Sequence, residues 1–181
     1  MAVFTPLFSQ SPWILALFPP ILTVRGGIGG IFSGNLATMM HLGLVKPRIR
    51  GNTEQYRGLI KSVLVITVMD TLILGAFSFV VNLINGSAQL GQWFLFISVP
   101  TVVCTLAVSV SIPITSLIAI ETYKRGLDPD ILVYPILASI NDIVVTTFFV
   151  GIVFLILRGM GFFFFLGALF LTIVSVAGYM A

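Results

Sequence analysis

The sequence predicts an all-α protein, a polytopic membrane bundle of about five membrane segments whose first helix is broken. Hydrophobic residues make up 58% of its 181 residues and charged residues only 8%, whereas soluble domains are about half apolar and a quarter charged. Long apolar runs alternate with short polar loops, as in chains with several spans. No boundary divides the chain, so we expect one transmembrane domain over residues 1–181, in the cell membrane.

The first apolar stretch, residues 13–43, is too long for one plain span. Pro19 and Pro20 remove backbone donors, and four glycines between residues 26 and 30 make the middle flexible. We therefore expect a broken helix with an irregular joint at residues 25–30. The carbonyl groups freed at such a joint could bind a cation, as in transporters with discontinuous helices.

Two other arrangements remain open for this stretch. Its glycines could instead serve close helix packing, as small residues do in membranes. Alternatively, the chain forms two full spans, residues 2–24 and 27–45, that turn at Arg25, which moves the N-terminus to the cytoplasmic side.

The remaining spans are expected at residues 62–84, 93–120, 131–157 and 161–181. Of the nine Lys and Arg residues, seven lie in the two loops 44–61 and 121–130, so the positive-inside rule makes these loops cytoplasmic. The chain then starts outside and ends inside. Since the basic residues belong to these loops, the net charge of +3 is no sign of nucleic-acid binding.

The span at residues 93–120 carries small hydroxyl side chains four residues apart, at Thr101, Thr105 and Ser109. This spacing favours contact with a neighbouring helix over a pore lining. Cys104 is expected to be a small buried residue, and His41, near the end of its helix, an interface residue more than a metal ligand.

The residue that dominates the sequence is Asp142, the twelfth of the span 131–157. At 1.5 Å per residue it lies roughly 16 Å from the start, near the middle of the hydrocarbon layer. An ionised carboxylate there costs at least about 2.5 kcal/mol. A cation, water or a proton must offset this cost.

The neighbours of Asp142 favour a cation. Helical spacing places Ser139 on the same face, with Asn141 beside it. Asp70 is a second acid at similar depth in the span 62–84, although either acid could instead be neutral or bonded to a neighbouring helix. Such oxygen-rich sites suit a largely hydrated Mg²⁺, and the lack of a His or Cys cluster argues against zinc or copper.

Asp128 and Asp130 flank Pro129 where the span 131–157 begins. Acidic residues at this position cap the helix and complement its dipole. We add the hypothesis that they also attract cations at a cytoplasmic entrance.

Two stretches resemble the membrane domain of the MgtE family of magnesium transporters, in its archaeal branch and the related eukaryotic solute carriers. Residues 22–43 read LTVRGGIGGIFSGNLATMMHLG, similar to the glycine-rich broken helix of the family. Residues 124–149 read KRGLDPDILVYPILASINDIVVTTFF, similar to its Asp-Pro-Asp start, mid-helix Pro and Ser-x-x-Asp. The resemblance covers residues 13–157, and the helix at 161–181 is additional.

The resemblance implies a homodimeric or internally duplicated bundle that carries Mg²⁺ down its electrochemical gradient, with no tightly bound cofactor. It implies that Asp142 holds the hydrated ion, and by the same matching it adds Asn35, Thr38 and Asp70 as candidate ligands. Gly27 stands where relatives often have Asn, so one expected oxygen is missing. The additional helix would suit one half of a hetero-assembly with a related half-transporter.

Three functions remain open at this stage. The leading one is a Mg²⁺ channel or transporter subunit that conducts a largely hydrated ion past Asp142. The alternatives are a proton- or sodium-coupled carrier of another divalent cation, and a non-conducting subunit of a larger transporter. An enzyme is not expected, because the sequence has no serine–histidine, zinc-binding or nucleotide-phosphate motif.

Overall fold

The structure is a computed structural model. Its backbone is described for residues 12–49, 51–127 and 129–181, and its side chains for residues 16–49, 51–127, 136–159 and 161–181. All the regular structure in these residues is helical: α2 (Pro12–His41), α3 (Glu54–Ile84), the short 3₁₀ helix η1 (Leu90–Gln92), α4 (Trp93–Lys124), α5 (Pro129–Leu157) and α6 (Met160–Met180). Five of the helices are long and apolar enough to cross a membrane, which confirms the predicted all-α, multi-pass architecture.

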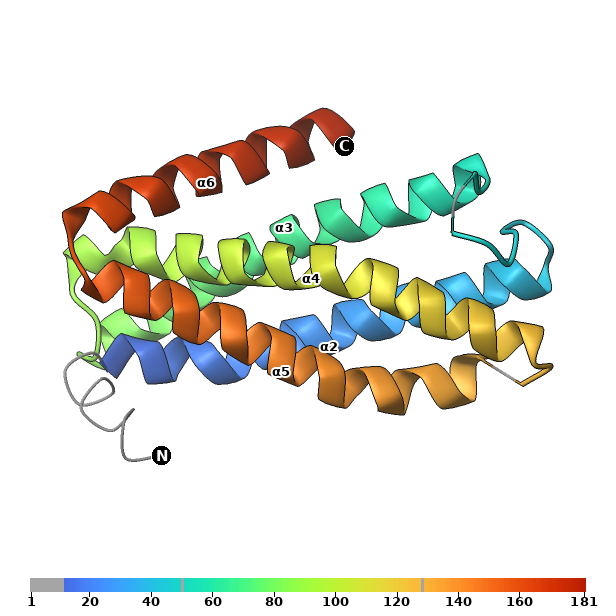
Figure 1. Ribbon diagram of the computed structural model, residues 1–181. Coiled ribbons are helices and arrows are strands. Elements are labelled where there is room, and N and C mark those ends of the chain that lie inside the picture. Colours follow the sequence, from blue (N-terminus) through green and yellow to red (C-terminus); the bar gives the residue numbers. More distant parts are fainter. Residues whose placement is uncertain (1–11, 50, 128) are drawn as a thin grey trace.

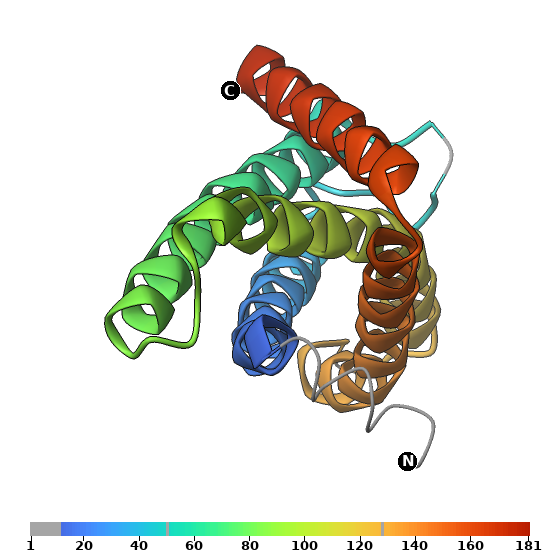
Figure 2. The same ribbon diagram turned by 90° about the vertical axis from the view of Figure 1, so that its left-hand side faces the viewer.

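Helices α2 to α5 run alternately up and down and form a four-helix bundle (Figure 1). Helix α2 packs against α3, α4 and α5, and α4 packs against the same two outer helices. Viewed along the bundle, α2 and α4 lie between α3 and α5 (Figure 2). The additional helix α6 lies outside this bundle, against α3 and α4.

The expectation of a broken first helix is wrong. Helix α2 is continuous through both prolines and all four glycines, and Arg25 is its fourteenth residue of 30 rather than a turn, so the two-span alternative also fails for the described residues. In lipid, each unsatisfied backbone group costs several kcal/mol, which favours a helix even through glycine. The hydroxyl of Thr23 donates a hydrogen bond to the Pro19 carbonyl (3.2 Å) within this stretch.

Helix α3 extends farther at its N-terminal end than the hydropathy predicts. Helix α3 begins at Glu54, eight residues before the expected start, and is about 46 Å long, more than the hydrocarbon layer requires. The loop is thereby shortened to residues 42–53. Asn52 closes this loop, because its side chain bonds the Lys46 backbone at both N–H and C=O and the Arg48 carbonyl.

Close packing through a small residue occurs at Gly75, on α3. A Cβ built there would lie 2.5 Å from the Phe96 carbonyl oxygen of α4. On α4, Thr101 is fully buried, and Thr105 and Ser109 line a cavity of about 220 Å³ with α3 and α6. This hydroxyl-bearing face therefore contacts neighbouring helices, as expected, and Cys104 is buried as expected.

Candidate functional site

Asp142 lies near the middle of its membrane-spanning helix, on the surface of the isolated chain. It is the fourteenth of the 29 residues of α5, and its side chain is exposed. An open depression of about 610 Å³ runs beside it along α5, lined also by Thr146, Thr147 and Gly151. Ser139, one turn earlier, is exposed as well. We call this surface, with Ser139, Asp142 and Thr146, the Asp142 face.

The Asp142 face adjoins α2. Asp142 precedes Phe149 by seven residues, two helical turns, so the two lie on the same face of α5. The Phe149 ring contacts Phe18 of α2, with centroids 5.1 Å apart. The hollow on the α4 side is lined by Phe148 and Ile152 and does not include Asp142, although Thr147 and Gly151 border both hollows. Asp142 therefore faces outward along the seam between α5 and α2.

Near Asp142, helix α2 carries two glycines. The contact of Phe18 with Phe149, and the approach of Gly29 to Asn141, fix the register of these antiparallel helices. In this register Asp142 is level with Gly26 and Gly27. Gly27 follows Phe18 by nine residues, two and a half turns, so it lies on the side of α2 away from α5, whereas Gly26 borders the seam. A Cβ added at Gly26 would meet no heavy atom within 4 Å, so this glycine leaves open space beside the carboxylate that a larger side chain would fill.

Asn141, an expected ligand, points away from this space. Its side chain is 7% exposed, and its amide oxygen accepts a hydrogen bond from the Ser111 hydroxyl of α4. Successive residues of a helix point about 100° apart, so Asn141 faces the bundle interior when Asp142 faces outward. The structure does not bring Asn141 together with Asp142 on one surface.

Asn35 and Thr38 are exposed on α2, but at a different depth from Asp142. They follow Gly27 by eight and eleven residues, about 12 and about 16 Å along the helix. Each side chain donates to its own helix, Asn35 to the Ile31 carbonyl (2.8 Å) and Thr38 to the Gly34 carbonyl (3.0 Å). Within one copy they are too distant to share an ion with Asp142, and they lie instead toward the 42–53 loop.

Asp70 lies on another side of the bundle. It is the seventeenth of the 31 residues of α3 and is exposed, and α2 and α4 separate α3 from α5 (Figure 2). Its neighbours Met69 and Ile73 are 57% and 69% exposed, typical of a lipid-facing surface. Among the described residues, no three His, Cys, Asp or Glu side chains come together.

The expected entrance residues are only partly within the described chain. Asp128 lies outside the described residues, and so does the side chain of Asp130. Pro129 is the first residue of α5, the position at which proline suits a helix start.

Arg25 forms a buried polar cluster that sequence reasoning missed. Its side chain is 2% exposed in the middle of α2. Its Nη1 lies 3.0 Å from a Cβ built on Gly29, and the Asn141 amide lies 3.5 Å from the same point. Asp142 is close enough for its charge to act on the guanidinium, although no ion pair within 4.0 Å joins them among the described residues. The burial of Arg25 was not predicted because the sequence suggested an irregular joint at this residue. The continuous α2 instead turns the Arg25 side chain inward.

A small cavity adjoins this arginine. Its volume is about 10 Å³, near the minimum for one water molecule, and its lining includes Ser111 and Thr115 of α4. Within the described part of the chain, the Arg25 Nε is buried without a hydrogen-bond partner. One water here would satisfy this donor. The spacing of Ser111 and Thr115, one turn apart on α4, is the sequence signal that could have located the cluster.

The comparisons with known proteins identify the family of the chain. No curated protein and no solved structure matches it significantly. The MgtE family, described as a divalent cation transporter, matches residues 18–152, which is more than half of the chain and includes Arg25, Asp70 and Asp142. Helix α6 lies beyond this match. This multi-pass membrane protein therefore belongs to the MgtE family of divalent cation transporters.

Proposed function

We propose that the chain is a subunit of a Mg²⁺ pathway in which Asp142 holds a largely hydrated ion at an interface between two copies. The observation that carries the proposal is a mid-membrane carboxylate on an open seam beside Gly26. Against lipid alone, an ionised carboxylate there costs at least about 2.5 kcal/mol. A facing copy that encloses water and a cation offsets this cost.

The space beside Asp142 favours an ion that keeps its water. Six waters occupy about 180 Å³ in the liquid, well within the depression of about 610 Å³. One copy supplies a single carboxylate and two hydroxyl groups, too few to replace six waters. Mg²⁺ gives up its water reluctantly and is commonly bound through one or two carboxylates.

The number of carboxylates favours two copies. One copy supplies one Asp142 carboxylate, whereas two copies supply two, whose charge equals that of a divalent ion. Each copy also adds the buried guanidinium of Arg25, a fixed positive charge nearby, so the site keeps a net positive charge. This charge lowers the affinity for the ion, and conduction requires binding that is weak enough for release.

The exposed face of α2 extends this site toward the 42–53 loop. Thr38 is exposed on α2, about 16 Å beyond the level of Asp142. Asn35 is exposed about one turn before it. We propose that these side chains contact the hydration shell of an ion on its way to Asp142, rather than sharing the Asp142 ion.

The test is Mg²⁺ uptake by the purified chain in liposomes, with Asp142→Asn and, as a matched control at similar depth, Asp70→Asn. We expect Asp142→Asn to lower uptake at least about tenfold, since even outer-shell partners of metal ligands affect binding by 10–100-fold. Asp70→Asn should stay within about twofold of the wild type.

Three results would overturn parts of the proposal. Uptake by Asp142→Asn at the wild-type rate removes Asp142 from the pathway. If the wild-type chain takes up Mg²⁺ only with an imposed proton or sodium gradient, it is a coupled carrier. A chain that conducts nothing alone, but conducts with a related partner, is a subunit of a hetero-assembly.

A further inference from the structure

A basic groove lies around the end of α4, away from the Asp142 face. It has a volume of about 870 Å³, and its described lining comes from the 42–53 loop, the last two turns of α4, the turn after α4 and Ile136 of α5. Helix α4 is about 48 Å long, so its last turns extend beyond a hydrocarbon layer of about 30 Å. The groove is therefore at the level of lipid headgroups.

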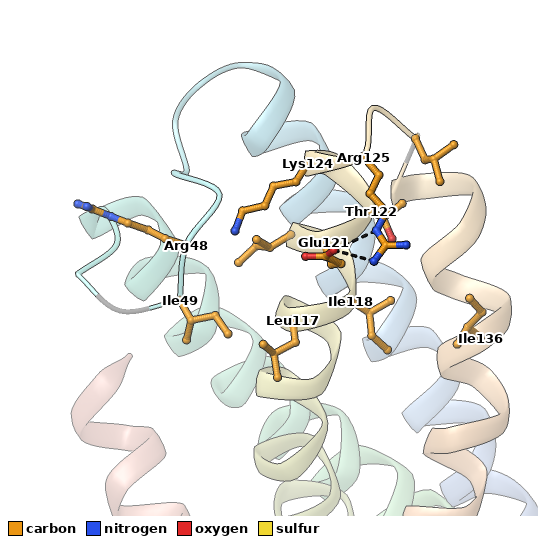
Figure 3. A pocket seen from close by; sticks show the side chains of 11 residues that line it. Arg48, Ile49, Leu117, Ile118, Glu121, Thr122, Lys124, Arg125 and Ile136 are labelled. Atoms are coloured by element: carbon orange, nitrogen blue, oxygen red, sulfur yellow. Dashed lines mark hydrogen bonds and ion pairs between the residues drawn. The ribbon is translucent and has the colours of Figure 1, made fainter.

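The upper part of the groove is positively charged. Arg48, Lys124 and Arg125 line it, with Glu121 as the acid among them. Glu121 is already paired with Arg125, at 2.9 Å from both Nε and Nη2. Lys124 projects from α4 toward the loop that carries Arg48 (Figure 3), and no ion pair within the described residues neutralises it. Among the described lining residues a net positive charge therefore remains for an anion.

The lower part of the groove is apolar. Leu117 lies one turn before Glu121 on α4, and Ile49 lies beside it on the loop (Figure 3). Leu117 is 55% exposed and Ile49 is 37% exposed, and Ile136 of α5 on the other flank is 51% exposed. Cations above exposed aliphatic side chains match a molecule with an anionic head and a hydrocarbon tail.

We propose that this groove binds an acidic phospholipid, with its phosphate at Lys124 and its acyl chains against Leu117. Basic pockets between helices on the cytoplasmic side suit anionic headgroups, and each Lys or Arg near an anionic surface contributes about 1 kcal/mol, or about fivefold in affinity. A free phosphate would bind the basic side chains but leave the apolar lower part of the groove uncovered. The proposal does not depend on the transport function.

The experiment is native mass spectrometry of the purified chain, titrated with phosphatidylglycerol and with phosphatidylcholine of the same acyl chains. The wild type should retain phosphatidylglycerol preferentially. Lys124→Gln should weaken this retention about fivefold, whereas Glu121→Gln, which frees Arg125, should strengthen it. The matched control is Arg158→Gln at the opposite end of the bundle, where Arg158 lies 4.6 Å from the Phe154 ring centroid; it should leave retention unchanged.

Further measurements distinguish binding of a phospholipid from binding of a free anion. Inorganic phosphate should not displace phosphatidylglycerol, and Leu117→Asn should weaken its retention although no charge changes. Asp142→Asn should retain the lipid normally. Equal retention of both lipids by the wild type, equal losses in the Lys124 and Arg158 variants, or displacement by inorganic phosphate would overturn the proposal.

Discussion

Two carboxylates lie near the middle of the membrane, and their surroundings differ. Asp142 of α5 faces an open seam with Gly26 of α2 beside it and a buried arginine nearby. Asp70 of α3 lies between Met69 and Ile73, which are apolar and exposed. Depth alone therefore does not distinguish a site from an isolated acid. The neighbouring helix does, because it provides the space, polar groups and counter-charge that an ion requires.

The largest effect expected to test this comparison is on stability. Asp70→Leu should stabilise the chain in lipid by about 2.5 kcal/mol, because it removes the cost of a carboxyl group at mid-membrane depth. Asp142→Leu should give a clearly smaller gain, because water and a cation already offset that cost. Reversible unfolding in bilayers or bicelles measures both changes.

Equal gains from the two leucine substitutions would contradict the comparison, because Asp142 would then face lipid as Asp70 does. A gain from Asp142→Leu alone would reverse the assignment of the two acids.

The next effect concerns the open space beside Asp142. Gly26→Leu should fold normally, because a Cβ there meets no heavy atom within 4 Å, but its side chain would occupy the volume of the hydrated ion. We expect Mg²⁺ uptake to fall about tenfold, a loss of about 1.4 kcal/mol in the binding of the ion.

The matched control for Gly26→Leu is Ala76→Leu, which adds a similar bulk at an exposed position of α3. Liposome uptake that falls equally in both variants, or in neither, would argue against an ion path along the α2–α5 seam.

The smallest effect concerns the buried charge. Arg25→Gln keeps an amide donor but removes the positive charge near Asp142, so the affinity for Mg²⁺ should rise a few-fold, consistent with about 1 kcal/mol of lost repulsion. Titration with Mg²⁺ measures this change in affinity. The double variant Arg25→Gln, Asp142→Asn, compared with Asp142→Asn alone, provides the control. An increase of equal size without the Asp142 carboxylate would show that Arg25 acts elsewhere.

Much of the fold was predictable from composition and charge. The apolar runs and the basic loops predict five spans and their order, because lipid requires long apolar helices whatever their neighbours. The break predicted in α2 was wrong because proline and glycine are local signals. The requirement that lipid-exposed backbone groups be bonded within the helix is stronger.

The candidate site was predictable only in part. The depth of Asp142 follows from its place in the sequence, and the structure places it on an accessible seam. The inward orientation of Asn141 and the burial of Arg25 depend on how α2, α4 and α5 pack together. A helical pattern in one segment gives the angle between neighbouring side chains but does not say which of them faces the bundle.

The most direct test of the central claim is a structure of the purified chain determined with Mg²⁺ and again after chelation. We predict an ion between two copies of α5, with water around it and the Asp142 carboxylates about 4 Å away, beyond an Mg–water distance of about 2.1 Å. The ion should disappear after chelation. Lipid acyl chains packed against Asp142 in both structures, with neither water nor an ion beside it, would contradict the account.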